Sequence, residues 1–132
     1  TRLVGVQPEV IARYNVVSAP VAAQMALGAA QASGSDIAVS VTGLAGPGGG
    51  DAVRPVGTVY LGAARGGTVY VQKLFVSRPD RALVRARAAQ AALTLALRLA
   101  QGKVPAHTKP LAAAQQQDEA ALAALNEAFL AE

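Results

Sequence analysis

A short apolar run that ends in glycine-rich sequence holds the residues best suited to chemistry. Thr42 and Gly43 directly follow the run Ile37–Val41, which is short enough to be a buried strand. Ala45 and Gly46 come shortly after. A hydroxyl at a strand end, followed by small residues, lets backbone N–H groups approach an anion or a developing oxyanion. The junction therefore predicts a ligand site, although a tight structural turn uses the same residue types.

Two common phosphate-binding motifs do not fit this junction. A Walker A loop needs Gly-Lys-Ser/Thr after its glycines, and Gly50 is followed by Asp51 and Ala52. A dinucleotide-binding fingerprint needs a helix directly after the glycines and an acidic residue further on, and the sequence offers neither. The residues of Thr42–Pro55 predict an irregular loop.

A pair of arginines forms the second candidate group. Arg81 and Arg85 are four residues apart at the start of a predicted helix, so they share one helix face. Cations at a helix N-terminus oppose the helix dipole and cost some stability. Their position therefore indicates an anionic ligand. Exposed arginines that pair with Asp80 or with solvent are the alternative.

Composition excludes several classes of chemistry. The chain has no cysteine, which excludes disulfides and thiolate metal sites. The single His107 lies in a proline-bounded stretch and cannot supply a multi-histidine site or a convincing Ser–His pair. The net charge of +4 comes from scattered basic residues, which does not favour nucleic acid as a partner.

The elements that position these groups can be read from apolar spacing. Pro8–Tyr14 predicts a short helix, and Ser18 can cap a second helix that ends near Gly34. Val56–Ala64 and Thr68–Val76 predict a hairpin with a glycine-containing turn. Its two Thr-Val-Tyr triplets are expected to be cross-strand partners.

A long helix is predicted from Pro79 to about Ala100. Its expected buried stripe consists of Leu83, Ala86, Gln90, Leu93 and Leu97. Gly102–Pro110 is predicted to be a linker, and Asp118–Ala131 an amphipathic helix with Leu122, Leu125 and Phe129 in register. That last helix can dock on the same domain, contact another copy or form a free tail. The element order predicts an α/β fold with helices packed on a mixed β-sheet.

No apolar run is long enough to cross a membrane, so a soluble, cytoplasmic protein without a membrane partner is expected. The sequence begins with Thr1 rather than methionine, and no signal-peptide pattern is visible. We therefore expect it to be part of a longer polypeptide.

Several stretches together carry a family resemblance. They are Leu3–Val6, Tyr14–Ser18, Met25, Asp36–Gly50, Arg54–Tyr60 and Pro79–Arg81 with Arg85 and Ala88. The string from Val41 to Gly50, followed by Pro55–Val59, is its most specific part. In these stretches the chain resembles the C-terminal domain of the CinA family, competence/damage-inducible proteins whose domain is a nicotinamide-nucleotide amidohydrolase. The resemblance implies a three-layer α/β/α fold that is N-terminally incomplete over residues 1–101, followed by an extension over 102–132.

The resemblance also implies site roles. It implies hydrolysis of the carboxamide of nicotinamide mononucleotide by a serine helped by a lysine, without a metal or other cofactor. Thr42 and Gly43 match catalytic positions. Ala45, Gly46, Arg81 and Arg85 match substrate-binding positions, with Arg81 on the phosphate. The serine and lysine segments lie upstream of Thr1 in the family. The 132 residues alone are therefore expected to be inactive. Ser77-Arg78-Pro79 also departs from the family, which usually has a glycine before the Asp-Arg pair.

Two readings of function remain open at this level. The first is the amidohydrolase, with a small pyridine nucleotide as its partner. The second is a non-catalytic nucleotide-binding module of the same fold. A homo-oligomer is compatible with both.

Overall fold

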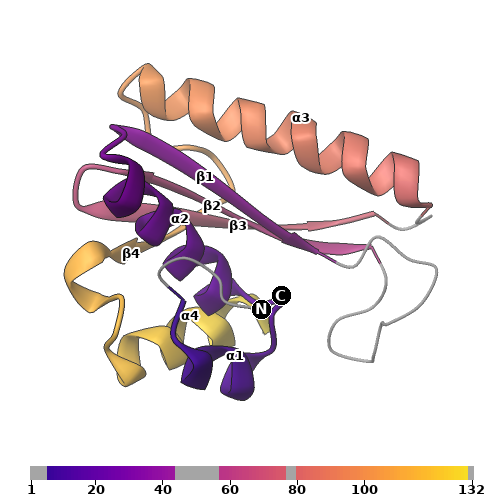
Figure 1. Ribbon diagram of the computed structural model, residues 1–132. Helices are drawn as coiled ribbons and strands as arrows, with labels where there is room; N and C mark the ends of the chain where they lie inside the picture. Colours follow the sequence, from indigo (N-terminus) through magenta and orange to yellow (C-terminus); the bar gives the residue numbers. More distant parts are fainter. Residues whose placement is uncertain (1–5, 44–56, 77–79, 131–132) are drawn as a thin grey trace.

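A four-stranded sheet lies between two layers of helices (Figure 1). The computed structural model describes residues 6–43, 57–76 and 80–130. Helix α3 covers one face of the sheet, and α1, α2 and α4 lie on the other. The elements are α1 (Pro8–Tyr14), α2 (Ala19–Ser33), β1 (Ile37–Gly43), β2 (Thr58–Arg65), β3 (Thr68–Phe75), α3 (Arg81–Ala100), β4 (Lys109–Ala112), the 3-10 turn η1 (Ala113–Gln115) and α4 (Glu119–Leu130).

The predicted boundaries of the first two helices are confirmed. Pro8 occupies the first turn of α1, where its missing N–H removes no hydrogen bond. The Ser18 hydroxyl accepts a hydrogen bond from the Val21 N–H at 3.4 Å and so caps α2. Gly34 ends α2 with φ of 68°, a conformation that suits glycine.

The sheet order is β1-β2-β3-β4, and all three pairings between described strands are antiparallel. The α/β class with helices on both faces is confirmed, but the parallel pairing that a mixed sheet requires is not among these strands. Between β3 and β4 the reason is visible in the chain path. Residues 101–108 bring the chain back along the sheet, so that Lys109 lies opposite Val71 and β4 runs against β3.

The hairpin is as predicted, but the pairing of its triplets is not. Gly66 has φ of 62° in a two-residue turn, so Arg65 lies opposite Thr68. Thr58 therefore lies opposite Phe75, and the two Thr-Val-Tyr triplets occupy different ends of the hairpin. The register follows from the turn, which a repeated triplet cannot override.

The buried stripe of α3 also differs from the prediction. The buried residues are Val84, Ala88, Leu95 and Leu99. Leu93 and Leu97, which were expected in the core, are 72% and 56% exposed. Alanine and leucine occupy most positions around this helix, so apolar spacing alone does not decide which side faces the sheet.

Helix α2 lies unusually close to β2. A Cβ added to Gly62 would come within 2.5 Å of the Ala22 carbonyl oxygen. The Ser40 hydroxyl of β1 donates to the same oxygen at 2.6 Å. The small residues Ala19, Ala22, Ala23 and Ala26 are fully buried at this interface. Glycine at position 62 is therefore a packing requirement.

Residues 109–130 contribute to the same core cluster as α1 and α2. Lys109 and Pro110, expected in the linker, are the first residues of β4, and Pro110 is tolerated because β4 is an edge strand. Of the three arrangements left open for the last helix, the structure shows docking on the same domain, since Leu122, Leu125 and Phe129 are buried in one cluster with Tyr60. The Phe129 ring meets the Tyr60 ring edge-on at a centroid distance of 5.7 Å.

No helix in the described part of the chain combines the length and the apolar character needed to cross a bilayer.

Candidate functional site

Thr42 and Gly43 end strand β1 rather than begin a loop. Thr42 lies opposite Tyr60, and Gly43 lies opposite Val59. The pairing with β2 keeps both residues extended, which is why the prediction of irregular structure from position 42 onward was wrong for these two. Ala45 and Gly46, with the rest of 44–56, lie outside the described residues.

The Thr42 hydroxyl has a structural partner. It donates a hydrogen bond of 2.7 Å to the Val16 carbonyl oxygen, and the side chain is 9% exposed. Val16 belongs to the turn between α1 and α2. That turn is held by its own hydrogen bonds, since the Ser18 hydroxyl donates to the Asn15 carbonyl at 2.8 Å and the Val17 N–H donates to Asn15 Oδ1 at 3.2 Å.

Gly43 is required by the packing of the strand pair. A Cβ at this position would lie 2.9 Å from Val59 Cγ2 and 3.2 Å from the Thr58 carbonyl oxygen. The close approach of β2 therefore explains a glycine here even without a ligand. Gly43 itself is exposed, so its backbone is accessible at the end of the sheet.

Arg81 and Arg85 are exposed in the first turns of α3. The helix begins at Asp80, whose Oδ1 accepts the Leu83 N–H at 2.8 Å. This cap holds the Asp80 carboxylate on the helix N-terminus, where a negative charge is favourable. The cap sets the position at which α3 begins, and therefore places Arg81 and Arg85 in its first turns.

The structure brings the end of β1 and the start of α3 to the same end of the molecule (Figure 1). It does not bring all predicted residues to one face. Residues alternate along β1, and Thr42 points to the α2 side, as Ser40 does, whereas α3 packs on the opposite face. The backbone at Gly43 and the two arginines of α3 thus share an end of the sheet, and the Thr42 hydroxyl is turned away from that face.

The turn at Asn15–Ser18 was not predicted as part of the site. The residue pattern gave no chemical reason to place it there, because the contact between Val16 and Thr42 spans 26 residues of sequence. Its inclusion in the family-like stretch Tyr14–Ser18 was the one available indication. Asn15 combines φ of 76° with ψ of 158°, a backbone conformation that residues other than glycine rarely adopt.

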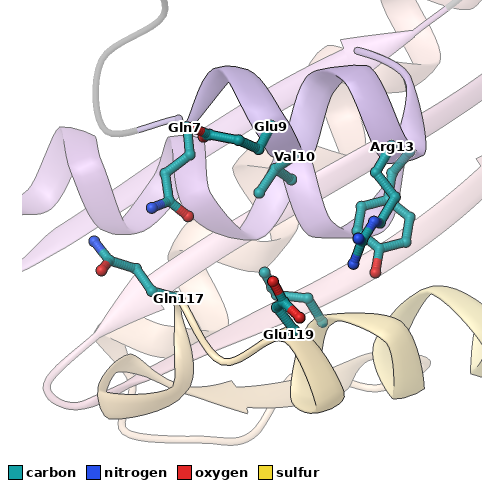
Figure 2. A pocket seen from close by; sticks show the side chains of 8 residues that line it. Gln7, Glu9, Val10, Arg13, Gln117 and Glu119 are labelled. Atoms are coloured by element: carbon teal, nitrogen blue, oxygen red, sulfur yellow. The ribbon is translucent and has the colours of Figure 1, made fainter.

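A separate hollow of about 310 Å³ lies between α1 and the start of α4 (Figure 2). Its lining mixes a guanidinium, two carboxylates and amides over an apolar floor. Gln7, Glu9, Val10 and Arg13 face it from α1 and its N-cap, and Gln117 and Glu119 face it from the other side. Of the predicted site residues that the structure describes (Thr42, Gly43, Arg81 and Arg85), none lines it. Within residues 6–43, 57–76 and 80–130 no cluster of three metal-ligating side chains occurs.

These features define an α/β domain whose helices cover both faces of a sheet. The end of strand β1 and the arginine-containing start of helix α3 lie at the same end of that sheet. The model of the CinA C-terminal domain family matches residues 1–100. The chain therefore belongs to the CinA C-terminal domain family, which confirms the resemblance seen in the sequence.

Individual relatives agree with this assignment. A CinA-like protein of Geobacter sp. (strain M21) is 52% identical over 85 residues, which are 64% of this chain and 20% of the relative. The nicotinamide-nucleotide amidohydrolase PncC of Enterobacter agglomerans is 47% identical over 97 residues, which are 73% of this chain and 58% of the relative. The crystal structure of the competence/damage-inducible protein CihA from Agrobacterium tumefaciens matches with a TM-score of 0.68 and 37% identity, covering 76% of this chain and 61% of that one.

The matched part of the chain covers only a share of each protein that it resembles. It spans about a fifth of the length of several CinA-like relatives. It spans 58% of the amidohydrolase and 61% of the Agrobacterium chain. Each of these proteins thus contains residues without a counterpart here.

Proposed function

We propose that this chain forms the larger part of a nicotinamide-nucleotide amidohydrolase domain. In the complete domain the carboxamide of nicotinamide mononucleotide is hydrolysed to a carboxylate, with release of ammonia. The serine and lysine that the family resemblance implies have no counterpart in the matching stretches of this chain. Family membership and the name of the Enterobacter relative support this reading.

The observation that carries the proposal is that two chemically different groups lie at the same end of the sheet. Gly43, which is exposed, ends β1, and the exposed residues Arg81 and Arg85 lie in the first turns of α3. The end of β1 and the start of α3 lie at the same end of the molecule (Figure 1). Backbone amides suit the oxyanion of acyl transfer, and guanidinium groups suit a phosphate. Nicotinamide mononucleotide carries both a carboxamide, whose hydrolysis forms an oxyanion, and a phosphate.

The predicted roles divide along the same line. Arg81 binds the phosphate, Arg85 adds positive charge one turn further on, and the Gly43 backbone lies by the carboxamide. Thr42 contributes by holding the Asn15–Ser18 turn through the Val16 carbonyl, which gives it a positioning role. Ala45 and Gly46 remain predicted substrate contacts.

The test uses a chimaeric protein in which residues 1–100 replace the matched part of the Enterobacter amidohydrolase. We expect it to convert nicotinamide mononucleotide to nicotinic acid mononucleotide and ammonia. Arg81→Ala should lower kcat/KM by roughly 10–100-fold, because a hydrogen bond to a charged group is worth about 1.5–3 kcal/mol. Arg98→Ala, at the far end of the same helix, is the matched control and should leave kcat/KM unchanged.

Each result decides something. Full activity in Arg81→Ala removes that residue from the phosphate site. A chimaera that binds the nucleotide but does not hydrolyse it, although the serine and lysine are present, favours the non-catalytic binding module.

A further inference from the structure

The hollow between α1 and α4 lies partly outside the family region. Its wall on the α1 side belongs to residues 1–100, which the CinA C-terminal domain model matches. The opposite wall, with Gln117, Glu119 and Leu122, follows that region in the sequence. The volume of about 310 Å³ is comparable to that of the smaller ligand pockets of proteins. The hollow therefore depends on the residues after position 100, and it is separate from the strand end that carries the proposed function.

A buried amide holds the two walls of the hollow in place. The Gln24 side chain of α2 is 1% exposed. Its Nε2 donates to the Gln116 carbonyl oxygen at 2.6 Å and to Gln7 Oε1 at 3.3 Å, and its Oε1 accepts the Gln7 N–H at 3.1 Å. Asp118 caps the start of α4, where its Oδ1 accepts the Ala120 N–H at 3.0 Å. These bonds tie the start of α1 to the segment that leads into α4, so the hollow is formed before any ligand arrives.

The two walls carry opposite charges that face each other. Arg13 extends from the last turn of α1 toward α4, and Glu119 extends from the first turn of α4 toward α1 (Figure 2). Within the described residues neither side chain forms a hydrogen bond or an ion pair. The amides of Gln7 and Gln117 lie at the other end of the hollow (Figure 2). A cationic donor, an anionic acceptor and neutral amides are thus available to a ligand.

This combination disfavours several simple ligands. An inorganic anion would meet the carboxylates of Glu9 and Glu119. A metal ion would meet the Arg13 guanidinium, and no group of three metal-ligating side chains occurs among the described residues. An apolar molecule would use the floor of the hollow, which the buried Val10 and Leu122 form, but none of its charges. The ligand that matches all of these groups carries both charges close together, a short apolar stem and a polar end.

We propose that the hollow binds a free α-amino acid of the glutamine type. Its carboxylate accepts hydrogen bonds from the Arg13 guanidinium, and its ammonium group donates to the Glu119 carboxylate. The methylene groups of its side chain lie on the apolar floor, and the terminal amide reaches Gln7 and Gln117. The site uses only residues that the structure describes, so it does not depend on the proposed function.

The test titrates the isotope-labelled 132-residue chain with L-glutamine and follows the amide chemical shifts by NMR. We expect shifts at Gln7, Arg13 and Glu119, and a dissociation constant in the millimolar range or tighter, as suits so small a ligand. Two analogues test the charges on the unchanged protein. Glutaramate lacks the ammonium group, and γ-aminobutyramide lacks the carboxylate. Each should bind at least about tenfold more weakly, because each loses one charge-assisted hydrogen-bonded pair.

Variants locate the two charges on the protein. Arg13→Gln and Glu119→Gln should each weaken L-glutamine binding at least about tenfold. Glu127→Gln makes the same charge change on α4 outside the hollow, and it should leave the affinity unchanged. All three residues are exposed, so the urea midpoints of unfolding should stay the same, which separates lost binding from a lost fold.

Three results would overturn the proposal. The first is the absence of shifts at the residues of the hollow when L-glutamine is added. The second is equal binding of L-glutamine and its two analogues, or an affinity that Arg13→Gln and Glu119→Gln both leave unchanged. The third is a response of the same residues to nicotinamide mononucleotide but not to L-glutamine, which would assign the hollow to the nucleotide.

Discussion

Single side chains at the end of β1 have structural tasks that the residue pattern only partly shows. Thr42 was identified from its type and its place before a glycine. Its partner Val16 could not be identified, because the hydrogen bond depends on how the α1–α2 turn packs against the sheet. Gly43 was assigned to a ligand, yet the nearby Val59 side chain already requires a glycine. The sequence thus singled out the residues at this strand end, but it did not predict the contacts that explain why they are a threonine and a glycine.

The bond between Thr42 and Val16 can be tested on the chain itself. Thr42→Val keeps the shape of the side chain but removes the donor, so we expect the free energy of unfolding to fall by about 1 kcal/mol. Urea unfolding measures it. Thr94→Val is the matched control, because the Thr94 hydroxyl donates to the Gln90 carbonyl on an exposed helix surface. It should change stability by less than about 0.5 kcal/mol. Equal losses in the two variants would contradict a special role for the buried bond.

Helix α2 packs closely on strand β2 because small residues face each other across the contact. The sequence predicted α2 and β2 separately, because each has a clear apolar spacing. It did not predict that the Ala22 carbonyl approaches Gly62 so closely, since that distance depends on how helix and sheet are stacked. The exposed Leu93 shows the same limit: a helix with apolar residues on most sides does not specify which side is buried.

The close approach of α2 gives a second prediction. Gly62→Ala places a Cβ 2.5 Å from the Ala22 carbonyl oxygen, a backbone atom that cannot rotate away. We expect a loss of about 1–3 kcal/mol, because α2 must shift away from the sheet. Gly67→Ala is the control, since a Cβ there meets nothing within 4 Å. The urea concentrations at the unfolding midpoints of the two variants should differ clearly. Coincident midpoints would show that α2 can shift without loss of stability.

The whole molecule is larger than the region that the family resemblance covers. The fold class was predicted because helix and strand spacings alternate clearly along the chain. The strand directions and the role of residues 109–130 were not, because β4 is only four residues long and Pro110 made it resemble a linker. Such a strand forms because β3 has an edge to pair with, and that information lies elsewhere in the chain.

The contribution of the last helix can be measured at its most buried residue. Phe129 is 2% exposed and packs against Tyr60 of β2. Phe129→Ala should lower the free energy of unfolding by about 3–5 kcal/mol. The neighbouring Leu130 is 45% exposed, and Leu130→Ala should cost far less. If α4 were an independent tail, the main unfolding transition would be the same in both variants.

Phe129 follows Tyr60 by 69 residues in the sequence, and this order has a consequence for biosynthesis. A ribosome releases the N-terminal part first, at roughly 5–20 residues per second. Tyr60 therefore emerges well before the aromatic ring that covers it in the finished protein. During that interval the nascent chain exposes an apolar sheet face that a chaperone can bind, and a stop codon shortly after position 100 would make the exposure permanent.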